Sequence, residues 1–398
     1  MRVQASAAAG TAVQVAEECR ELGLVPVHVG PSGVQLELDW PELARALLHL
    51  RIAQRVLIEL SRAEVRDGDD LYEAASALPW EDWLDRRSTF AITATGTLPG
   101  GGTGRREANS ASTEARGPLR HHVFAAQRVK DAIADRLTER LGGRPDVDVD
   151  DPDVRVVVRF QGNRCTFSLD PAGAALFQRG WRQQQVEAPL KETLAAAVVA
   201  HAAWHPERPL RDAFCGSGTL IVEALHRGLG IAPGIGRFFA VERWPHHGAE
   251  VRLSLDPLRA EAIDAARAAA SAAVGQLDVI ASDVDPAALA VTARNLSTAG
   301  LDGVVQLMCV DAVRLAPPPP GTVLLGNPPY GERIGGRDVG DLYRALGDHW
   351  RKFDGAEAWL VDGHPQFRQQ FGLRPFQTVP LRNGALEIRL QGYHLGHS

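Results

Sequence analysis

The stretch Asp212-Ala213-Phe214-Cys215-Gly216-Ser217-Gly218-Thr219 decides the fold class of this chain. It follows a short apolar run and precedes the helical pattern Leu220–Leu225, so it predicts a turn from a strand into a helix. Glycines in such a turn let the backbone pass close beneath a ligand, and the first N–H groups of the helix point at that ligand. A lone Gly-x-Gly fits an ordinary tight turn equally well, so other features must decide.

Helices and strands alternate on both sides of this turn. A helix is predicted at Pro189–Trp204, where Pro189 suits a first helical position. Strands are expected at Leu210–Phe214, Val279–Asp283, Val305–Cys309, Val323–Gly326 and Trp359–Val361. This alternation is typical of a mostly parallel, doubly wound, Rossmann-like α/β sheet. Asn383-Gly384, between two alternating runs, predicts a hairpin and an antiparallel strand at the edge of the sheet.

The first 171 residues predict two smaller α/β units. For residues 1–60 we expect a ferredoxin-like sandwich with a first short strand, helices at Val13–Leu22 and Pro41–Leu50, and strands at Val34–Leu38 and Val56–Leu60. For residues 61–171 we expect helices near Leu71–Leu78 and Ala125–Leu141, and strands at Thr89–Thr95, Val154–Phe160 and Arg164–Leu169. The aperiodic stretch Gly100–Gly117 predicts a loop insertion. Residues 172–398 form the third unit.

Composition limits the class of protein. A chain of 398 residues with 45% hydrophobic and 23% charged residues is typical of a soluble globular protein of two or three domains. No apolar run is long enough to cross a bilayer, and Gln14, Glu17 and Glu18 make the N-terminal Ala-rich stretch an amphipathic helix instead of a signal peptide. Four scattered cysteines predict neither a zinc site nor disulfides, so we expect a cytoplasmic protein without a metal.

Two carboxylates follow later strands of the predicted sheet. Asp283, followed by Val284, ends one strand, where its side chain can accept hydrogen bonds from ribose hydroxyls. Asp311, followed by Ala312, comes after the next strand and can accept a hydrogen bond from an adenine amino group. Either acid alone fits a helix N-cap, but the pair at two strand ends favours a nucleoside site. Roughly 65 residues separate the glycines from Asp283, against about 20 in a plain dinucleotide fold.

The motif Gly326-Asn327-Pro328-Pro329-Tyr330-Gly331-Glu332-Arg333 follows the fourth strand. In isolation it fits an extended turn, but at the carboxyl end of a strand beside a nucleoside site it predicts a catalytic loop. The Asn327 side-chain oxygen and the Pro328 carbonyl can accept the two N–H bonds of an exocyclic base amine, while Pro329 stiffens the loop and Tyr330 offers a ring for stacking. Accepting both hydrogens exposes the nitrogen lone pair, so catalysis rests on positioning and preorganised electrostatics.

By these motifs the chain resembles the class I S-adenosylmethionine-dependent methyltransferases with an N-terminal THUMP domain, and most closely the bacterial 23S ribosomal RNA guanine-N2 methyltransferases. The resemblance covers nearly the whole chain. It rests on the glycine turn, on Asn327–Arg333, and on Asp151–Val156, Arg179–Arg182 and Ala188–Ala195. The chain departs from the family at Gln183–Glu187, where relatives usually carry an Asp-Arg-Ala-Gly-like run, and in the Gly100–Gly117 insertion.

The resemblance implies S-adenosylmethionine as the cofactor and structured RNA as the partner. It places Glu192 and Thr193 near the methionine end of the cofactor. It places Asp283 with Val284 at the ribose and Asp311 with Ala312 at the adenine. The turn residues expected to bind the cofactor are Asp212, Phe214, Gly216, Ser217, Gly218 and Thr219. Asn327, Pro328, Pro329 and Tyr330 are the expected catalytic residues.

The net charge of −6 excludes wholesale wrapping of nucleic acid but leaves room for local basic patches. Residues 101–130 carry Arg105, Arg106, Arg116, Arg120, Arg128 and Lys130. A solvated loop face is the simpler interpretation; within a THUMP-like unit an RNA backbone contact becomes plausible. The expected RNA contacts are Arg128, Lys130, Arg179, Arg182 and Arg333.

Four alternatives to a 23S ribosomal RNA guanine-N2 enzyme stay open. Transfer RNA guanine-N2 enzymes share the architecture, while DNA adenine and protein glutamine methyltransferases also use Asn-Pro-Pro-Tyr; the resemblance of the N-terminal 170 or so residues to an RNA-binding unit opposes these last two. An RNA-binding protein with a decayed catalytic domain is the non-enzymatic alternative, which the intact loop and cofactor acids oppose. Neither the RNA, the nucleotide nor the oligomeric state follows from the sequence.

Overall fold

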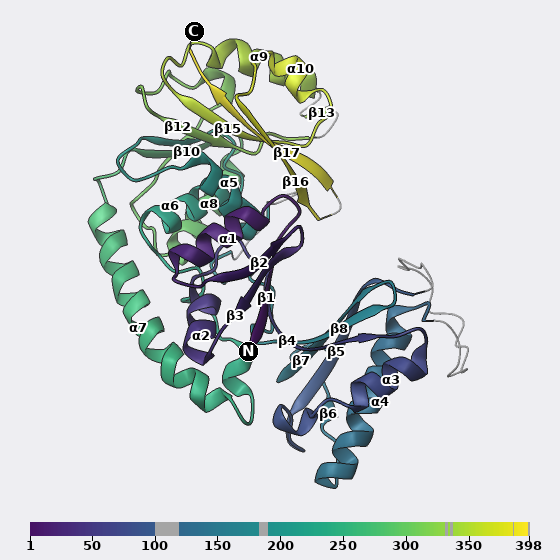
Figure 1. The fold of residues 1–398 in the computed structure, drawn as a ribbon. Coiled ribbons are helices and arrows are strands. Elements are labelled where there is room, and N and C mark those ends of the chain that lie inside the picture. Colours follow the sequence, from purple (N-terminus) through teal and green to yellow (C-terminus); the bar gives the residue numbers. More distant parts are fainter. Residues whose placement is uncertain (100–118, 183–189, 331–332, 335–336, 385, 397–398) are drawn as a thin grey trace.

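The computed structural model describes residues 1–99, 119–182, 190–330, 333–334, 337–384 and 386–396 (Figure 1). The predicted loop Gly100–Gly117 and the divergent run Gln183–Glu187 lie outside these residues. Among the described residues, no helix combines the length and apolarity needed to cross a membrane. Within the same ranges, no cluster of His, Cys, Asp or Glu is suited to hold a metal ion.

The C-terminal unit is built on a seven-stranded sheet in the order β11-β10-β9-β12-β15-β17-β16. Five strands are parallel: β9 (Leu210–Asp212), β10 (Val279–Asp283), β11 (Gln306–Cys309), β12 (Val323–Gly326) and β15 (Glu357–Asp362). The hairpin of β16 (Gln377–Asn383) and β17 (Leu386–His394) adds two antiparallel strands. The predicted α/β sheet with an antiparallel edge is therefore confirmed. The predicted end of β9 at Phe214 is wrong, because the Phe214 N–H already turns back to the Asp212 side chain.

Helices cover both faces of this sheet, as β12 illustrates. Val323 and Leu325 pack on the layer of α5 (Glu192–Ala202), α6 (Thr219–Gly228) and α8 (Pro286–Thr298). Leu324, which points the other way, packs on α9 (Val339–Trp350) and α10 (Phe367–Phe371). Because the five central strands are parallel, their carboxyl ends lie at one edge of the sheet, where ligands bind in such folds.

One long helix lies in the region where the sequence indicated only an insertion. Helix α7 (Gly248–Ala273) connects β9 and α6 to β10 and runs along the side of the molecule to α2 (Trp40–His49) of the N-terminal unit (Figure 1). Because α7 packs against α2 there, the insertion connects the C-terminal unit to the N-terminal unit.

The two N-terminal units share a single eight-stranded sheet, ordered β2-β3-β1-β4-β8-β7-β5-β6. Its strands are β1 (Arg2–Ser6), β2 (Pro26–Gly30), β3 (Gly33–Glu37), β4 (Arg55–Glu64), β5 (Thr89–Thr97), β6 (Asp146–Val147), β7 (Val154–Gln161) and β8 (Arg164–Asp170), with helices α1 (Ala12–Glu21), α2, α3 (Gly68–Ser76) and α4 (His122–Leu141). The first half of β4 pairs with β1 and the second half with β8. The predicted unit boundary after residue 60 falls inside this strand.

Buried charges join the N-terminal unit to the C-terminal one. Arg179 contacts Glu223 of α6 at 3.3 Å (Nε to Oε1), and its Nη2 donates to the Arg51 carbonyl at 2.5 Å. The side chains of Arg179 and Glu223 are only 2% and 1% exposed. Arg51 in turn donates to the Ile231 carbonyl, while Glu18 of α1 accepts the Arg51 N–H. These buried contacts fix the position of the N-terminal unit relative to the C-terminal unit.

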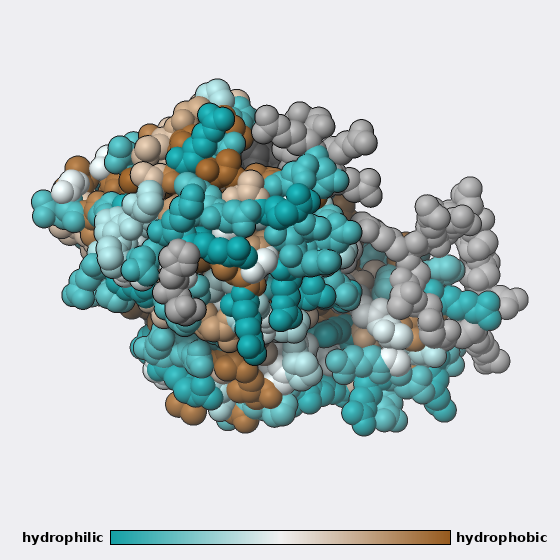
Figure 2. Space-filling view, turned by 90° about the horizontal axis from the view of Figure 1, so that it is seen from above, coloured by the Kyte–Doolittle hydropathy of each residue, from teal (hydrophilic) through white to brown (hydrophobic). Residues whose placement is uncertain are grey.

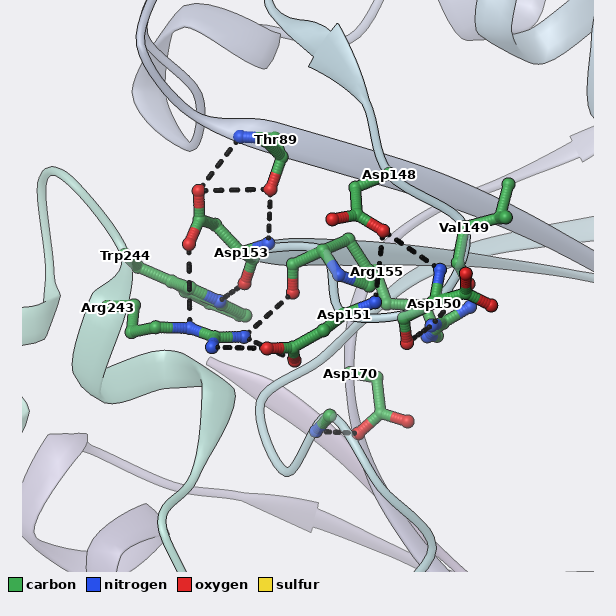
Figure 3. A network of polar contacts seen from close by, with 12 residues as sticks. Thr89, Asp148, Val149, Asp150, Asp151, Asp153, Arg155, Asp170, Arg243 and Trp244 are labelled. Atoms are coloured by element: carbon green, nitrogen blue, oxygen red, sulfur yellow. Dashed lines mark hydrogen bonds and ion pairs between the residues drawn. The ribbon is translucent and has the colours of Figure 1, made fainter.

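A second polar joint ties the insertion before α7 to the THUMP-like half of the long sheet (Figure 3). Arg243 makes two hydrogen bonds to the Asp151 carboxylate, at 2.9 and 2.8 Å, and lies 3.4 Å from Asp153. The Trp244 indole donates to the Asp153 carbonyl, and the Asp153 carboxylate accepts from the Thr89 N–H. The motif Asp151–Val156 is thus explained in part by this joint.

The first prediction concerns the buried joint. Glu223→Gln keeps the shape of the side chain but leaves the Arg179 guanidinium buried without its carboxylate, a change that typically costs about 3–5 kcal/mol of unfolding free energy. We expect a clearly lower midpoint in urea denaturation. As a control, Asp264→Asn removes an exposed pair with Arg267, whose side chains are 80% and 78% exposed, and should leave the midpoint unchanged. Equal midpoints for both variants would contradict a stabilising joint.

Candidate methyl-transfer site at the sheet edge

The glycine turn lies at the carboxyl edge of the sheet, between β9 and α6. Gly216 and Gly218 adopt positive φ angles of 53° and 81°, which favour glycine. Helix α8 holds the turn from the side: Thr292 donates to the Gly216 carbonyl at 2.8 Å, and Asn295 donates to the Ser217 carbonyl at 2.9 Å. A Cβ on Gly218 would lie 3.0 Å from the Thr292 methyl group, so the close approach itself requires glycine.

Asp212 ends β9 directly beneath this turn and is 1% exposed. Its Oδ1 accepts the Phe214 N–H at 3.2 Å, whereas Oδ2 is buried and has no hydrogen-bond partner among the described residues. Burial, aided by the nearby Asp283 charge, raises the pKa of Asp212 to about 7. An unpaired buried carboxyl at a ligand edge is suited to a cationic or hydrogen-donating group.

The structure brings the other two acids to the same edge. Asp283, at the end of β10, accepts the Gly216 N–H at 2.9 Å and the Asp285 N–H at 3.0 Å, and the neighbouring Val284 is 68% exposed. Asp311 follows β11, the strand next to β10, and accepts the Val313 N–H at 3.1 Å beside the buried Ala312. The two carboxylates therefore lie at adjacent strand ends, as the sequence predicted.

Glu192 and Thr193 open helix α5 and are 3% and 2% exposed. Glu192 contacts Arg182 at 3.0 Å, and burial raises the pKa of Glu192 despite this cation. Arg182 also donates to the Thr219 hydroxyl at 2.7 Å, so it links the start of α5 to the start of α6. The predicted RNA contact for Arg182 is wrong, because its side chain is 8% exposed and its donors serve this link.

The Asn327–Tyr330 loop follows β12, which pairs with β9, and so lies beside the glycine turn. The Tyr330 hydroxyl donates to Asn327 Oδ1, the oxygen expected to accept a base N–H. The Tyr330 ring rests on Gly363 after β15, where a Cβ would come within 2.9 Å of it. In this arrangement the Tyr330 hydroxyl occupies the acceptor that the sequence predicts for a base amine.

Sequence reasoning missed Tyr343 of α9. Its hydroxyl donates to the Pro329 carbonyl at 2.5 Å, and the side chain is fully buried. Pro329 follows Pro328, whose carbonyl is an expected acceptor of the amine, so this bond constrains the direction of the Asn327–Tyr330 loop. No local pattern pointed to Tyr343, because it belongs to the apolar stripe of a helix.

A cavity of about 810 Å³ opens beside Gly363, between the loop after β1 and the β16–β17 hairpin. Gly10 lines it from the N-terminal unit, and Arg382 and Arg389 line it from the hairpin. The buried Asp362 forms part of its wall and accepts a hydrogen bond from Gln391 at 2.6 Å. The N-terminal unit therefore shapes the surroundings of the catalytic loop.

The other residues predicted to contact RNA lie in different surroundings. Arg179 is buried in the joint with Glu223, so the predicted contact of its side chain with RNA is wrong. Arg128 pairs with Asp69 at 3.1 Å, and Lys130 pairs with Asp131 at 2.8 Å, both on the helical layer. Of Arg333 the structure describes the backbone, in β13 (Arg333–Ile334), and its contact stays a prediction.

Comparisons with known proteins agree with this architecture. Residues 179–391 match the family described as RMKL-like, methyltransferase domain; residues 65–98 and 107–170 match the THUMP domain; residues 2–57 match the RlmL ferredoxin-like domain. The putative RNA methyltransferase slr0064 of Synechocystis is 32% identical over 98% of this chain and 96% of its own length. The ribosomal RNA large subunit methyltransferase K/L of Syntrophotalea carbinolica is 35% identical over 98% of this chain, which spans 53% of that protein.

Several solved structures resemble the whole chain, two of which are named here. SMU.472, a putative methyltransferase complexed with SAH, is 26% identical with a TM-score of 0.83, covering 100% of this chain and 98% of its own. A predicted N6-adenine-specific DNA methylase from Listeria monocytogenes is 29% identical with a TM-score of 0.82, covering 99% and 96%. The resemblance seen in the sequence is thereby confirmed, and the chain belongs to the RMKL-like methyltransferase family, in the form that carries RlmL ferredoxin-like and THUMP domains.

Proposed function

We propose that this chain transfers a methyl group from S-adenosylmethionine to the exocyclic N2 amine of a guanine in structured RNA, with 23S ribosomal RNA as the substrate class. The observation that carries the proposal is the juxtaposition of the Asn327–Tyr330 loop after β12 with the glycine turn after β9, on paired parallel strands. One site supplies amine acceptors and the other a nucleoside-binding edge, which together make a methyl-transfer site.

The residues at the edge fit S-adenosylmethionine, which supplies an activated methyl group on a sulfonium when bound. The orphaned Asp212 oxygen is suited to hold the cofactor's cationic end, with Glu192 and Thr193 nearby on α5. Asp283 and Asp311 are suited to the ribose and the adenine, and Val284 and Ala312 follow them directly in the chain. The similar structure of SMU.472 is complexed with SAH, which supports the same cofactor class.

The chain's own groups act on the amine. The lone pair of a base amine is delocalised into the ring, so the amine is a weak nucleophile until both N–H bonds are accepted. Asn327 and the Pro328 carbonyl accept them, and Tyr330 stacks on the base after leaving Asn327. Tyr343 keeps the Pro328-Pro329 backbone in place by its bond to the Pro329 carbonyl.

RNA is favoured over DNA by the N-terminal half, which matches THUMP and RlmL ferredoxin-like domains, and by the names of the curated relatives. Transfer RNA is a second RNA candidate. The Listeria neighbour is named as a DNA adenine methylase, and its likeness is the observation in favour of that activity. Nucleoside mass spectrometry of ribosomal RNA, transfer RNA and DNA from cells with and without the gene separates the three. Loss of N2-methylguanosine from ribosomal RNA is the expected result, whereas loss of N6-methyladenine from DNA would refute the proposal.

Cofactor binding should depend on pH through Asp212. Its carboxyl has a raised pKa of about 7, so it is protonated below that value and ionised above it. A cationic cofactor prefers the ionised form, so affinity should rise between pH 5.5 and 7.5, by at most about tenfold per unit below the pKa. Calorimetric titration with S-adenosylmethionine measures this. Asp212→Asn should bind more weakly with a flatter profile; an equally steep profile in the variant would assign the titration to another group.

Loss of Asn327 tests the chemistry itself. Asn327→Ala removes one preorganised acceptor, which typically slows such a step about 10²–10³-fold, without changing cofactor affinity. Tyr330→Ala should weaken base capture, since stacking of a base on an aromatic ring contributes roughly 1–3 kcal/mol. Tyr330→Phe should keep most activity, because the ring stays and no hydroxyl occupies Asn327. Single-turnover transfer with saturating cofactor is the assay, and a near wild-type rate for Asn327→Ala would disprove the amine contacts.

Tyr343 offers a matched pair of variants. Tyr343→Phe deletes the hydroxyl bonded to Pro329 and should lower kcat by up to about 10²-fold through misplacement of the loop, with cofactor affinity unchanged. Tyr393→Phe deletes an equally buried hydroxyl in the same core, one that donates to Gln391 instead. It should leave kcat unchanged. If both variants lose activity equally, Tyr343 acts through general packing and does not position the loop.

A further inference from the structure

One part of the long sheet has a face that no helix covers among the described residues. Strands β5, β7 and β8 and the second half of β4 lie side by side. Helices α3 and α4 pack on one face, where Val156, Val158 and Phe160 of β7 are buried. The alternate residues point to the opposite face. At the end nearest Thr97, the described residues of that opposite face are open to solvent.

Strand register arranges the open end into two adjoining rows. One row runs Arg62–Thr166–Arg159–Thr95 across four strands, and the next runs Glu64–Arg164–Gln161–Thr97. Most of these eight residues are exposed; Thr166 is half-buried and Arg62 is 54% exposed at its side chain. We name as the distal face the six residues Arg62, Thr95, Arg159, Gln161, Arg164 and Thr166.

The charges of the distal face are largely free. Among the described residues, neither Arg159 nor Arg164 has an ion-pair or hydrogen-bond partner for its guanidinium, whereas Arg62 pairs with Glu59 at 2.7 Å. Glu64, at the edge beside Arg164, is the acid of the two rows. On the helical layer of the same unit, by contrast, Arg128 and Lys130 are neutralised by Asp69 and Asp131. Arg159 and Arg164 therefore place two unpaired cations in adjoining rows of the sheet.

The chemistry of this surface suits a phosphodiester backbone. Guanidinium groups bind phosphate oxygens with two parallel donors, and threonine hydroxyls and the Gln161 amide can bond sugar hydroxyls. The distal face has no aromatic side chain to stack a base, so it favours contacts that position RNA without reading its sequence. Figure 1 shows this unit projecting away from the C-terminal sheet, which separates the face from the catalytic loop. The face of the molecule seen in Figure 2 is also mostly hydrophilic.

We propose that the RNA backbone docks on the distal face, with Arg159 and Arg164 neutralising phosphates. The proposal rests on the proposed RNA methyltransferase function. It adds to that function a second surface, which binds the RNA at a distance from the target guanine. It replaces the contacts predicted for Arg128 and Lys130 on the opposite, helical layer.

The test compares two double variants of the full chain. Arg159→Ala/Arg164→Ala removes two cations of the distal face. The control Arg140→Ala/Arg144→Ala removes two exposed arginines outside that face: Arg140 lies in the last turn of α4, and Arg144 follows this helix. Binding to an unmodified 23S ribosomal RNA transcript is measured from 50 to 200 mM KCl. Each lost phosphate contact should reduce the slope of log affinity against log salt by about 1. We expect a reduction of about 2 for the first pair and none for the second.

Equal slopes for wild type and the Arg159/Arg164 variant, or equal reductions in both pairs, would overturn the proposal. Cofactor affinity and thermal midpoint are expected to match wild type. Arg159→Gln/Arg164→Gln keeps a polar, hydrogen-bonding side chain without the positive charge. The same reduction from this pair attributes the effect to charge, whereas an unreduced slope would count against the proposal. Wild-type chain that binds the transcript but transfers no methyl group to it would refute the 23S assignment, while the slopes would still decide the docking face.

Discussion

The buried charge cluster around Arg179 is the constraint on which the arrangement of this molecule depends. Arg179 bonds to Glu223 in the catalytic unit and to the backbone of Arg51 in the N-terminal unit. A buried guanidinium is costly unless a carboxylate and carbonyls satisfy it. A shift of one unit against the other that kept Arg179 buried would remove these partners and incur that cost. The N-terminal half is therefore held in a set position relative to the catalytic edge.

The long N-terminal sheet is joined to the C-terminal unit at more than one place. Helix α7 packs on α2 beside the first half of the long sheet, and the Arg243–Asp151 joint reaches the THUMP-like half. Strand β4 pairs with β1 in one half and, past a bulge at Glu59–Ser61, with β8 in the other. With RNA docked on the distal face, as proposed, a fixed spacing between that face and the Asn327–Tyr330 loop would select which nucleotide of a folded RNA reaches the site. Selection by distance suits a protein whose net charge of −6 gives no general attraction for nucleic acid.

At the proposed site, two acceptors of the Asn327–Tyr330 loop have hydrogen-bond partners within the chain. Tyr330 bonds to Asn327, and Tyr343 bonds to the Pro329 carbonyl. Asp212 differs, with one buried oxygen left without a partner among the described residues. The unpaired acid and the paired Asn327 oxygen thus lie after β9 and β12, two adjacent strands of the sheet.

The amino-acid sequence by itself determined the α/β sheet, the glycine turn, the two strand-end acids, the Asn327–Tyr330 loop and the family, because apolar alternation and turn residues report local geometry directly. Only the tertiary structure decided that Arg179 and Arg182 are buried, that Tyr343 supports the loop and that Arg159 and Arg164 share a face. These facts depend on pairings between distant segments, and a local pattern states whether a residue is polar without stating its partner. Strand register and helix packing determine that partner. They therefore decide whether an arginine is buried as a structural link or exposed without an ion pair.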